Sequence, residues 1–191
     1  MPSPREPQPQ LWTVWPGHDF DTTEHLDLQE QIASMAWDIL DPTPYHDYHE
    51  YKQALQVAKP GGTEGWYRNI ASQVWQFSHE IQAGDYIIMP MRRKDSTGQE
   101  LFSLAVVLDN TFGWQPARKD GKLTRQVRWL YTNIPRGVMK PWRIEGNSKT
   151  VTRQTELTPA LATAHIVKYV LWREQAQTQP QTQPQTPPKE A

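Results

Sequence analysis

The spacing of apolar residues changes from a helical to a strand period between residues 81 and 86, and this change sets the fold class. Trp66, Ile70, Val74, Phe77 and Ile81 recur at intervals of three and four residues. This spacing predicts a helix over residues 64–81 whose five apolar side chains face the core. Short β-rich segments replace it from residue 84 onward. Helices followed by strands favour an α+β domain.

The segments after residue 84 predict most of a small sheet. Residues 85–91 and 101–108 read as a hairpin with a polar nine-residue loop, and residues 125–131 and 149–155 as two more strands. A short strand is expected at residues 11–15, and a helix that opens with Thr-Pro at residues 158–172. We therefore expect a small β-barrel-like sheet flanked by helices.

Two helices are predicted before the sheet. Residues 24–40 carry Leu28, Ile32, Met35, Trp37 and Ile39 at helical spacing, and the sequence DPTP follows. Residues 45–58 form the second, which ends at Lys-Pro-Gly-Gly.

The two ends of the chain differ in composition from the middle. Residues 1–10 and 174–191 are rich in Pro and Gln and poor in apolar residues, so we expect them to be disordered and residues 11–173 to form one domain. The chain has no cysteine, which excludes disulfides and thiolate metal sites. No apolar run approaches the roughly 20 residues of a membrane span, and no signal peptide is evident. A soluble, cytoplasmic protein is expected.

Common catalytic signatures do not occur in the chain. It lacks a Gly-rich phosphate loop, a G-x-S-x-G elbow and an H-E-x-x-H motif. His46, His49 and Glu50 are spaced so that they could hold a divalent metal, although a solvated helix face explains the same residues. We predict no metal, no cofactor and no catalytic residue.

A nuclease centre is the weakest alternative. Asp38 and Asp41 precede Glu50-Tyr51-Lys52, which is formally the acid, then acid-x-lysine, order of many metal-dependent nucleases. In such enzymes the second element lies on a strand, whereas these residues are predicted to be helical.

Charge is distributed unevenly along the chain. Residues 17–64 contain ten acidic residues and two lysines, whereas residues 86–153 contain thirteen Lys and Arg and five acidic residues. The two halves could neutralise each other in the fold. Alternatively, the basic half could bind a nucleic acid.

The basic half also contains candidate residues for reading a base. An extruded base requires flat walls and a polar edge, and phosphates require cations. We predict Trp75, Trp114 and Trp129 as stacking walls and Asp109 as a hydrogen-bond acceptor. The predicted phosphate contacts are Arg118, Arg125, Arg128 and Arg136.

The same tryptophans could instead be core residues. Trp129 alternates with Val127 and Tyr131 on one strand face, as core residues of a strand do, and Trp114 stands at the start of a loop where either role is open.

A family resemblance adds to this interpretation. Trp15 in the first strand, the blocks QVWQFSHEIQAGDYIIMP and LAVVLDNTFGW, and then RQVRWLYTNIPRGVM and KTVTRQT follow in an order that resembles the N-terminal domain of Mrr-like restriction-system proteins. That domain is a branch of the PUA/EVE-like superfamily, which reads modified or flipped bases. The resemblance covers residues 11–155. It departs from the family at an aromatic pair, for which Phe112 and Trp114 would substitute.

The resemblance implies a non-catalytic module that binds DNA, with modified bases expected, in a restriction or defence system. The family's domain is commonly joined to a nuclease, so a nuclease or other effector would act in trans. The alternatives are an RNA-binding PUA-like reader, a protein-interaction adaptor that uses the acidic residues 17–64, and the metal-dependent nuclease.

Overall fold

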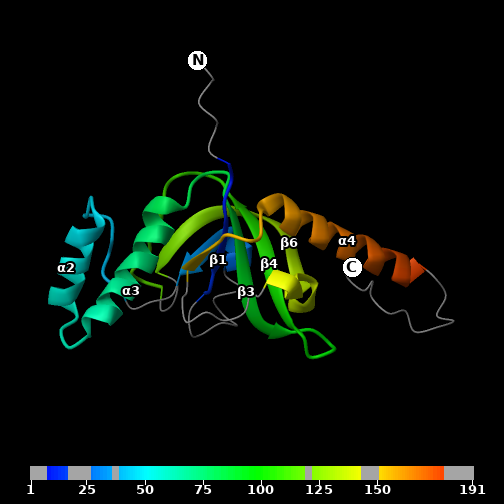
Figure 1. Cartoon of the computed structure of the whole chain (residues 1–191), viewed down its shortest axis with the longest axis horizontal. Coiled ribbons are helices and arrows are strands. Elements are labelled where there is room, and N and C mark those ends of the chain that lie inside the picture. Colours follow the sequence, from blue (N-terminus) through cyan, green and yellow to red (C-terminus); the bar gives the residue numbers. More distant parts are fainter. Residues whose placement is uncertain (1–7, 17–26, 36–38, 119–121, 143–150, 179–191) are drawn as a thin grey trace, which may run out of the picture.

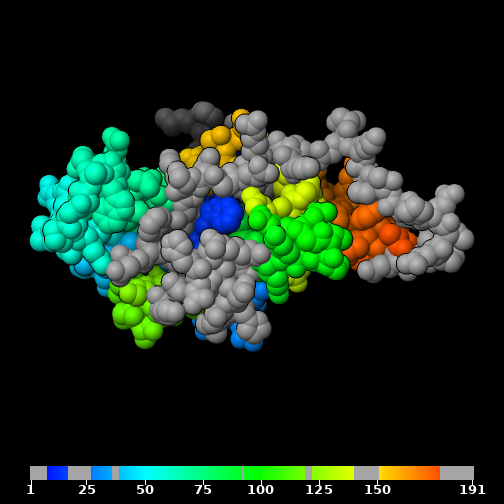
Figure 2. Space-filling view, turned by 90° about the horizontal axis from the view of Figure 1, so that it is seen from below, coloured from blue at the N-terminus to red at the C-terminus, as the bar shows by residue number. Residues whose placement is uncertain are grey.

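The structure is a computed structural model that describes residues 8–16, 27–35, 39–118, 122–142 and 151–178 (Figure 1). A curled sheet forms the centre, helices α2 and α3 lie at one end, and α4 lies across the other (Figures 1 and 2). Its helical elements are α2 (Tyr48–Ala58), α3 (Glu64–Trp75), the π-helix η1 (Gln76–Glu80), the 3-10 segment η2 (Arg136–Trp142) and α4 (Pro159–Thr178). The strands are β1 (Leu11–Val14), β2 (Ile32–Met35), β3 (Tyr86–Lys94), β4 (Glu100–Val107), β5 (Gly113–Trp114), β6 (Leu123–Pro135) and β7 (Val151–Gln154).

The strands form one sheet in the order β2-β6-β4-β3-β1-β7, and β5 pairs with Leu123 and Thr124 of β6 on the edge opposite β2. β1 and β3 run parallel, and the other pairs are antiparallel. The sheet curls into a half-barrel (Figure 1). The α+β fold with a barrel-like sheet is therefore confirmed.

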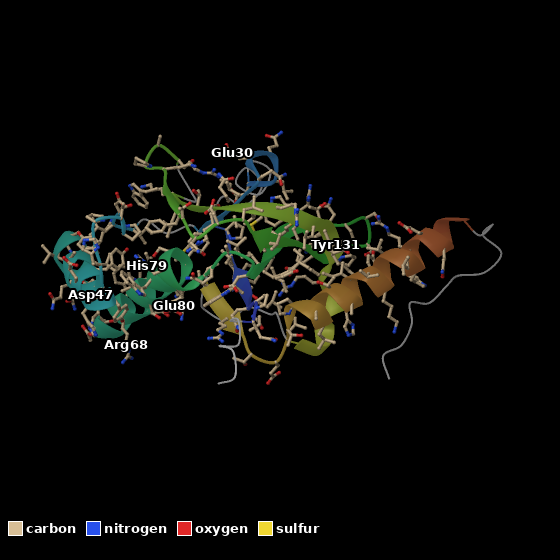
Figure 3. All side chains as sticks on the ribbon, turned by 90° about the horizontal axis from the view of Figure 1, so that it is seen from above. Glu30, Asp47, Arg68, His79, Glu80 and Tyr131 are labelled. Atoms are coloured by element: carbon tan, nitrogen blue, oxygen red, sulfur yellow. The ribbon has the colours of Figure 1, made fainter. Side chains whose placement is uncertain are left out.

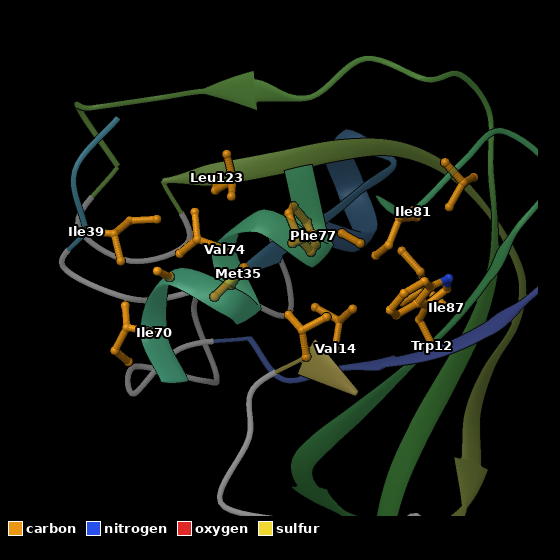
Figure 4. Close-up of a cluster of buried hydrophobic side chains, with 14 of the residues drawn as sticks. Trp12, Val14, Met35, Ile39, Ile70, Val74, Phe77, Ile81, Ile87 and Leu123 are labelled. Atoms are coloured by element: carbon orange, nitrogen blue, oxygen red, sulfur yellow. The ribbon is translucent and has the colours of Figure 1, made fainter. Parts of the chain in front are cut away.

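The two faces of the sheet bury two different cores. The main core joins the inner face to helices α2 and α3, through residues such as Trp12, Val74 and Phe77 (Figure 4). The second core joins the outer face to η2 and α4, and contains Phe102 and Ile166. The helical face predicted for residues 64–81 is thus correct for four of its five residues. Trp66 is the exception: it is 39% exposed and packs edge-on against Tyr67, because it lies in the first turn of α3.

The predicted helix over residues 24–40 is wrong. Within this range the structure describes residues 27–35, 39 and 40: residues 27–30 are helical, Gln31 adopts a positive φ of 55°, and β2 follows. All four residues of β2 are buried, and the strand pairs with β6 from Ile32 opposite Gln126 to Met35 opposite Leu123. A strand that is covered on both faces consists of consecutive buried residues, and the apolar ones can also fit the spacing of a helix. Here the strand is favoured because β2 provides hydrogen-bond partners for the backbone of β6.

Several element boundaries also differ from the sequence prediction. The β3–β4 hairpin is longer than expected, because Lys94 pairs with Glu100 and the Asp95 carboxylate accepts hydrogen bonds from the turn. Strand β5 was not predicted. Helix α4 continues to Thr178, beyond the expected end at Trp172 and into the predicted tail. No helix in the described ranges combines the length and apolar character that a membrane span requires.

Candidate functional site

Three partly exposed rings contact one another where α3 ends, and we call Trp75, His79 and Phe112 the aromatic cluster. The Trp75 and His79 rings are stacked, with centroids 3.7 Å apart and planes 8° apart. The Phe112 ring lies 5.5 Å from that of His79 at 53°. Two segments far apart in the sequence thus build one aromatic surface.

A change in helix geometry shapes this surface. α3 gives way to the π-helix η1 at Gln76, where the Ile81 N–H donates to the Gln76 carbonyl over 3.0 Å, an i to i+5 bond. Residues four apart lie above one another on a helix surface, so Trp75 and His79 can stack. Single-turn π-helices are frequent at functional sites.

Arg125 holds the two segments of the cluster together. Its side chain is buried, with 1% exposure, and donates to the carbonyls of Phe77 and Ser78, each over 2.7 Å. It also donates to the carbonyls of Thr111 and Asp109, over 3.2 and 3.4 Å. The prediction that Arg125 contacts phosphate is therefore wrong, because the guanidinium is inside the protein and bonded to its backbone.

Burial also changes the electrostatics of the cluster. Desolvation lowers the pKa of Arg125 to about 10, against the opposing effect of the Asp109 and Asp85 charges. Desolvation, and then the charge of Arg125, lower the pKa of His79 below its ordinary value of 6.5. The imidazole is accordingly neutral at neutral pH.

The loop before β5 brings Asp109 to this end of the molecule. One oxygen of its carboxylate accepts from the Thr111 N–H and hydroxyl, over 2.9 and 2.7 Å, which turns the chain toward Phe112. Trp114 follows in β5, opposite Leu123 of β6. It is half-buried and packs against the main core. Trp75 is thus part of the cluster and Asp109 lies in the loop that carries Phe112. Trp75 and Phe112 pack against the main core as Trp114 does, but no ring contact joins Trp114 to the cluster among the described residues.

Two other predicted residues meet at a different place. Arg118, whose side chain is 12% exposed, pairs with Asp27 over 2.8 Å and with Glu30 over 2.7 Å. The indole N–H of Trp129 donates to the Asp27 carbonyl over 3.3 Å. Trp129 also packs against the main core and against Met89 and its neighbours. Arg118 and Trp129 therefore stabilise the fold around Asp27.

Asp27 was missed by the sequence analysis. Its carboxylate is buried and accepts from the N–H and hydroxyl of Ser34, over 3.0 and 2.5 Å. Burial raises its pKa to about 7, although the Ser34 hydroxyl and the Arg118 charge oppose this. Its contacts with Arg118 and Trp129 span 91 and 102 residues, so no local motif could have revealed them.

The remaining arginines do not complete a common basic rim. Arg128 is exposed on β6 opposite Val106, as a phosphate contact would have to be. Arg136 is paired with Glu100, and its guanidinium lies 5.5 Å from the centroid of the Trp15 ring. The four arginines were predicted to hold one nucleic-acid backbone, and the structure separates them.

The sequence analysis also missed an exposed cation on α3. Arg68 is exposed on α3 (Figure 3), and helical spacings of four and three put it on the same face as Ser72 and Trp75. The Lys52 hydrogen bond and, less strongly, the charge of Arg68 lower the pKa of Glu64 one turn earlier in α3, without a direct ion pair to Arg68 among the described residues. Seven residues of helix place it about 10 Å along the axis from Trp75.

The residues of the metal and nuclease alternatives have structural contacts on α2. Glu50 accepts a hydrogen bond from the His46 N–H over 3.2 Å, and Lys52 pairs with Glu64. Asp38 lies outside the described residues. Among those described, no group of three His, Asp or Glu could hold a metal ion.

Comparison with known proteins gives one family. The model of a family described as a domain of unknown function, DUF8426, matches residues 12–155, which include the sheet, α3 and the aromatic cluster. No curated protein matches the chain.

Proposed function

Since the chain belongs to the DUF8426 family, we propose its function from the aromatic cluster: it binds nucleic acid without catalysis, by stacking an unpaired or flipped base on these rings. The bound nucleic acid is DNA, and the protein recognises it for a restriction or defence system whose nuclease acts in trans. The setting and the preference for modified DNA rest on the resemblance to the Mrr-like, PUA/EVE-like domains.

The observation that carries the proposal is a solvent-facing aromatic surface built on a rigid support. Trp75, His79 and Phe112 are only partly buried, yet Arg125 fixes both of their backbone segments from inside. Rings held in place lose little conformational entropy when a base stacks on them. Each stacked base contributes about 1–3 kcal/mol to binding.

The cations near the cluster favour a single strand over a duplex. Arg68 is exposed on the same face of α3 as Trp75, and we assign it to a phosphate one or two nucleotides from the stacked base. A duplex is held by cations placed along its phosphate backbone. Arg118, Arg125 and Arg136 already have protein partners, so they do not provide such a row of cations.

A binding experiment with a matched control tests the proposal. We would titrate the protein with labelled single-stranded DNA, RNA of the same sequence and duplex DNA, with and without modified cytosine. Trp75→Ala and Phe112→Ala should each weaken binding of single-stranded DNA by about 1–3 kcal/mol. Trp66→Ala is the control, because Trp66 is an exposed tryptophan of the same helix outside the cluster.

Three results would contradict the proposal. The first is that folded Trp75→Ala and Phe112→Ala proteins bind as tightly as wild type. The second is that the Trp66→Ala control loses as much affinity as they do. The third is that no nucleic acid binds. Tighter binding of RNA than DNA would favour the RNA-reader alternative, because the 2′-hydroxyl distinguishes the two.

A further inference from the structure

The protonation of His79 follows from its hydrogen bonds. The Ser78 hydroxyl lies 2.7 Å from the Val74 carbonyl oxygen and 2.7 Å from Nδ1 of His79. A carbonyl oxygen can only accept, so the single hydroxyl proton points to Val74. The Ser78 oxygen must then accept from Nδ1–H. His79 therefore carries its proton on Nδ1, and its Nε2 has a free lone pair.

This lone pair faces solvent. No described residue forms a hydrogen bond with Nε2 of His79. Among the described residues, the buried polar side-chain atom without a partner is the Thr152 hydroxyl, so Nε2 is not buried. The neutral state is maintained because desolvation and Arg125 lower the pKa of the ring. The edge of the imidazole thus offers an acceptor at the surface of the aromatic cluster.

We propose that Nε2 of His79 accepts a hydrogen bond from an exocyclic amino group of the bound base, so the site prefers cytosine or adenine to uracil or thymine. This inference rests on the proposed function, since it assigns the specificity of the same cluster. A base bonded edge-on to Nε2 lies in the plane of the imidazole, which is parallel to the Trp75 indole to within 8°, so in this arrangement the base stacks on Trp75 and lies beside His79. Uracil and thymine present a carbonyl oxygen where cytosine has its amino group, and that oxygen repels the lone pair.

The charged groups around His79 come from three segments. Arg125 from β6 acts on His79 directly, the charge of Asp109 in the loop before β5 acts on Arg125, and Glu80 follows His79 in η1. Among these side-chain types, histidine is the one whose ordinary pKa lies between pH 5.5 and 8. The pKa of His79 is lowered from 6.5, so its protonation belongs below that pH. Protonation turns Nε2 from an acceptor into a donor, and the preference for an amino group should then be lost.

The test uses short DNA strands that carry one base flanked by abasic sites, so that only the chosen base can stack. Wild-type protein at pH 7.5 should bind the deoxycytidine strand about threefold to tenfold more tightly than the deoxyuridine strand, the range for one hydrogen bond. His79→Phe keeps an aromatic ring without the acceptor, and it should remove this preference while the uridine strand still binds. The wild-type preference should also fall once the pH is lowered below the pKa of His79.

The possible outcomes separate the two proposals. A His79→Phe protein that still prefers cytosine, or a wild-type protein that prefers uridine, overturns the role of His79. In that case loss of binding in Trp75→Ala would still support the aromatic cluster. If the single-base strands bind no better than a fully abasic strand, the proposed function itself fails.

Thermal unfolding of His79→Phe shows whether the variant is folded, and His79→Gln, which keeps an acceptor without the ring, provides the second variant. His79→Gln should retain part of the cytosine preference, and its complete loss there would contradict an acceptor role.

Discussion

Replacement of Arg125 by methionine would remove a buried charge from the support of the aromatic cluster. Methionine has an unbranched stem of similar length, so the space is largely refilled. The guanidinium is what disappears, with its two 2.7 Å hydrogen bonds to the carbonyls of Phe77 and Ser78 and the longer ones to the Asp109 loop. The variant therefore isolates the polar contribution of this residue.

The expected cost follows from these bonds. A hydrogen bond to a charged group contributes about 1.5–3 kcal/mol, so the two short bonds together contribute about 3–6 kcal/mol. Part of this loss is offset, because a guanidinium with 1% exposure no longer has to be desolvated. We expect Arg125→Met to lower the free energy of unfolding by about 2–4 kcal/mol.

Urea unfolding at pH 7, followed by circular dichroism and tryptophan fluorescence, measures this loss. Arg128→Met is the matched control, because Arg128 lies in the same strand and is exposed. Its stability should change by less than about 0.5 kcal/mol. The two variants make the same chemical change on two faces of β6.

A loss below about 1 kcal/mol for Arg125→Met, or one no larger than that of Arg128→Met, would refute this reasoning. If Arg125→Met kept its stability while DNA binding became weaker and less dependent on salt, the phosphate contact would return as the better explanation.

Three further predictions concern other parts of the molecule. The pKa of Asp27 is raised to about 7 in the folded state, so the free energy of unfolding falls as the pH rises and Asp27 ionises. The difference in unfolding free energy between wild type and Asp27→Asn should therefore fall by up to about 4 kcal/mol from pH 4 to 7.5, and a constant difference in urea unfolding would contradict this. Trp114→Ala should lower the free energy of unfolding by about 2 kcal/mol, because Trp114 is half-buried against the core. This is less than the roughly 3–5 kcal/mol expected for a fully buried tryptophan. An unchanged melting temperature would show that Trp114 is a free pocket wall. With Mg²⁺ or Mn²⁺ the purified protein should not cleave plasmid DNA, and specific cutting abolished by Glu50→Gln would revive the nuclease alternative.

The local patterns of the sequence predicted much of the fold correctly. The period of α3 and the alternation in β3, β4 and β6 depend on neighbours within one element, and such neighbours are visible in the sequence. β2 was mistaken for a helix because its partner, β6, lies some ninety residues away. Strand β5 has two residues, too few to show any period.

For the site, the residues of the sequence determined which side chains could take part, and tertiary structure decided which of them do. Trp75 was predicted as a stacking wall, and it is in the aromatic cluster. Its partner His79 was not proposed, although it follows Trp75 by four residues within the predicted helix, the spacing at which side chains lie above one another.

The arginines show the same division most clearly. Sequence alone established that the second half of the chain is basic, because charge is a property of each residue wherever it lies. Whether an arginine faces a phosphate, a carboxylate or a carbonyl depends on groups that folding brings close. Arg128 faces solvent, Arg118 pairs with a carboxylate 91 residues earlier, and Arg125 bonds to carbonyls 47 and 48 residues earlier. Burial then decides the role, because a desolvated guanidinium must be satisfied inside the protein and cannot reach a ligand.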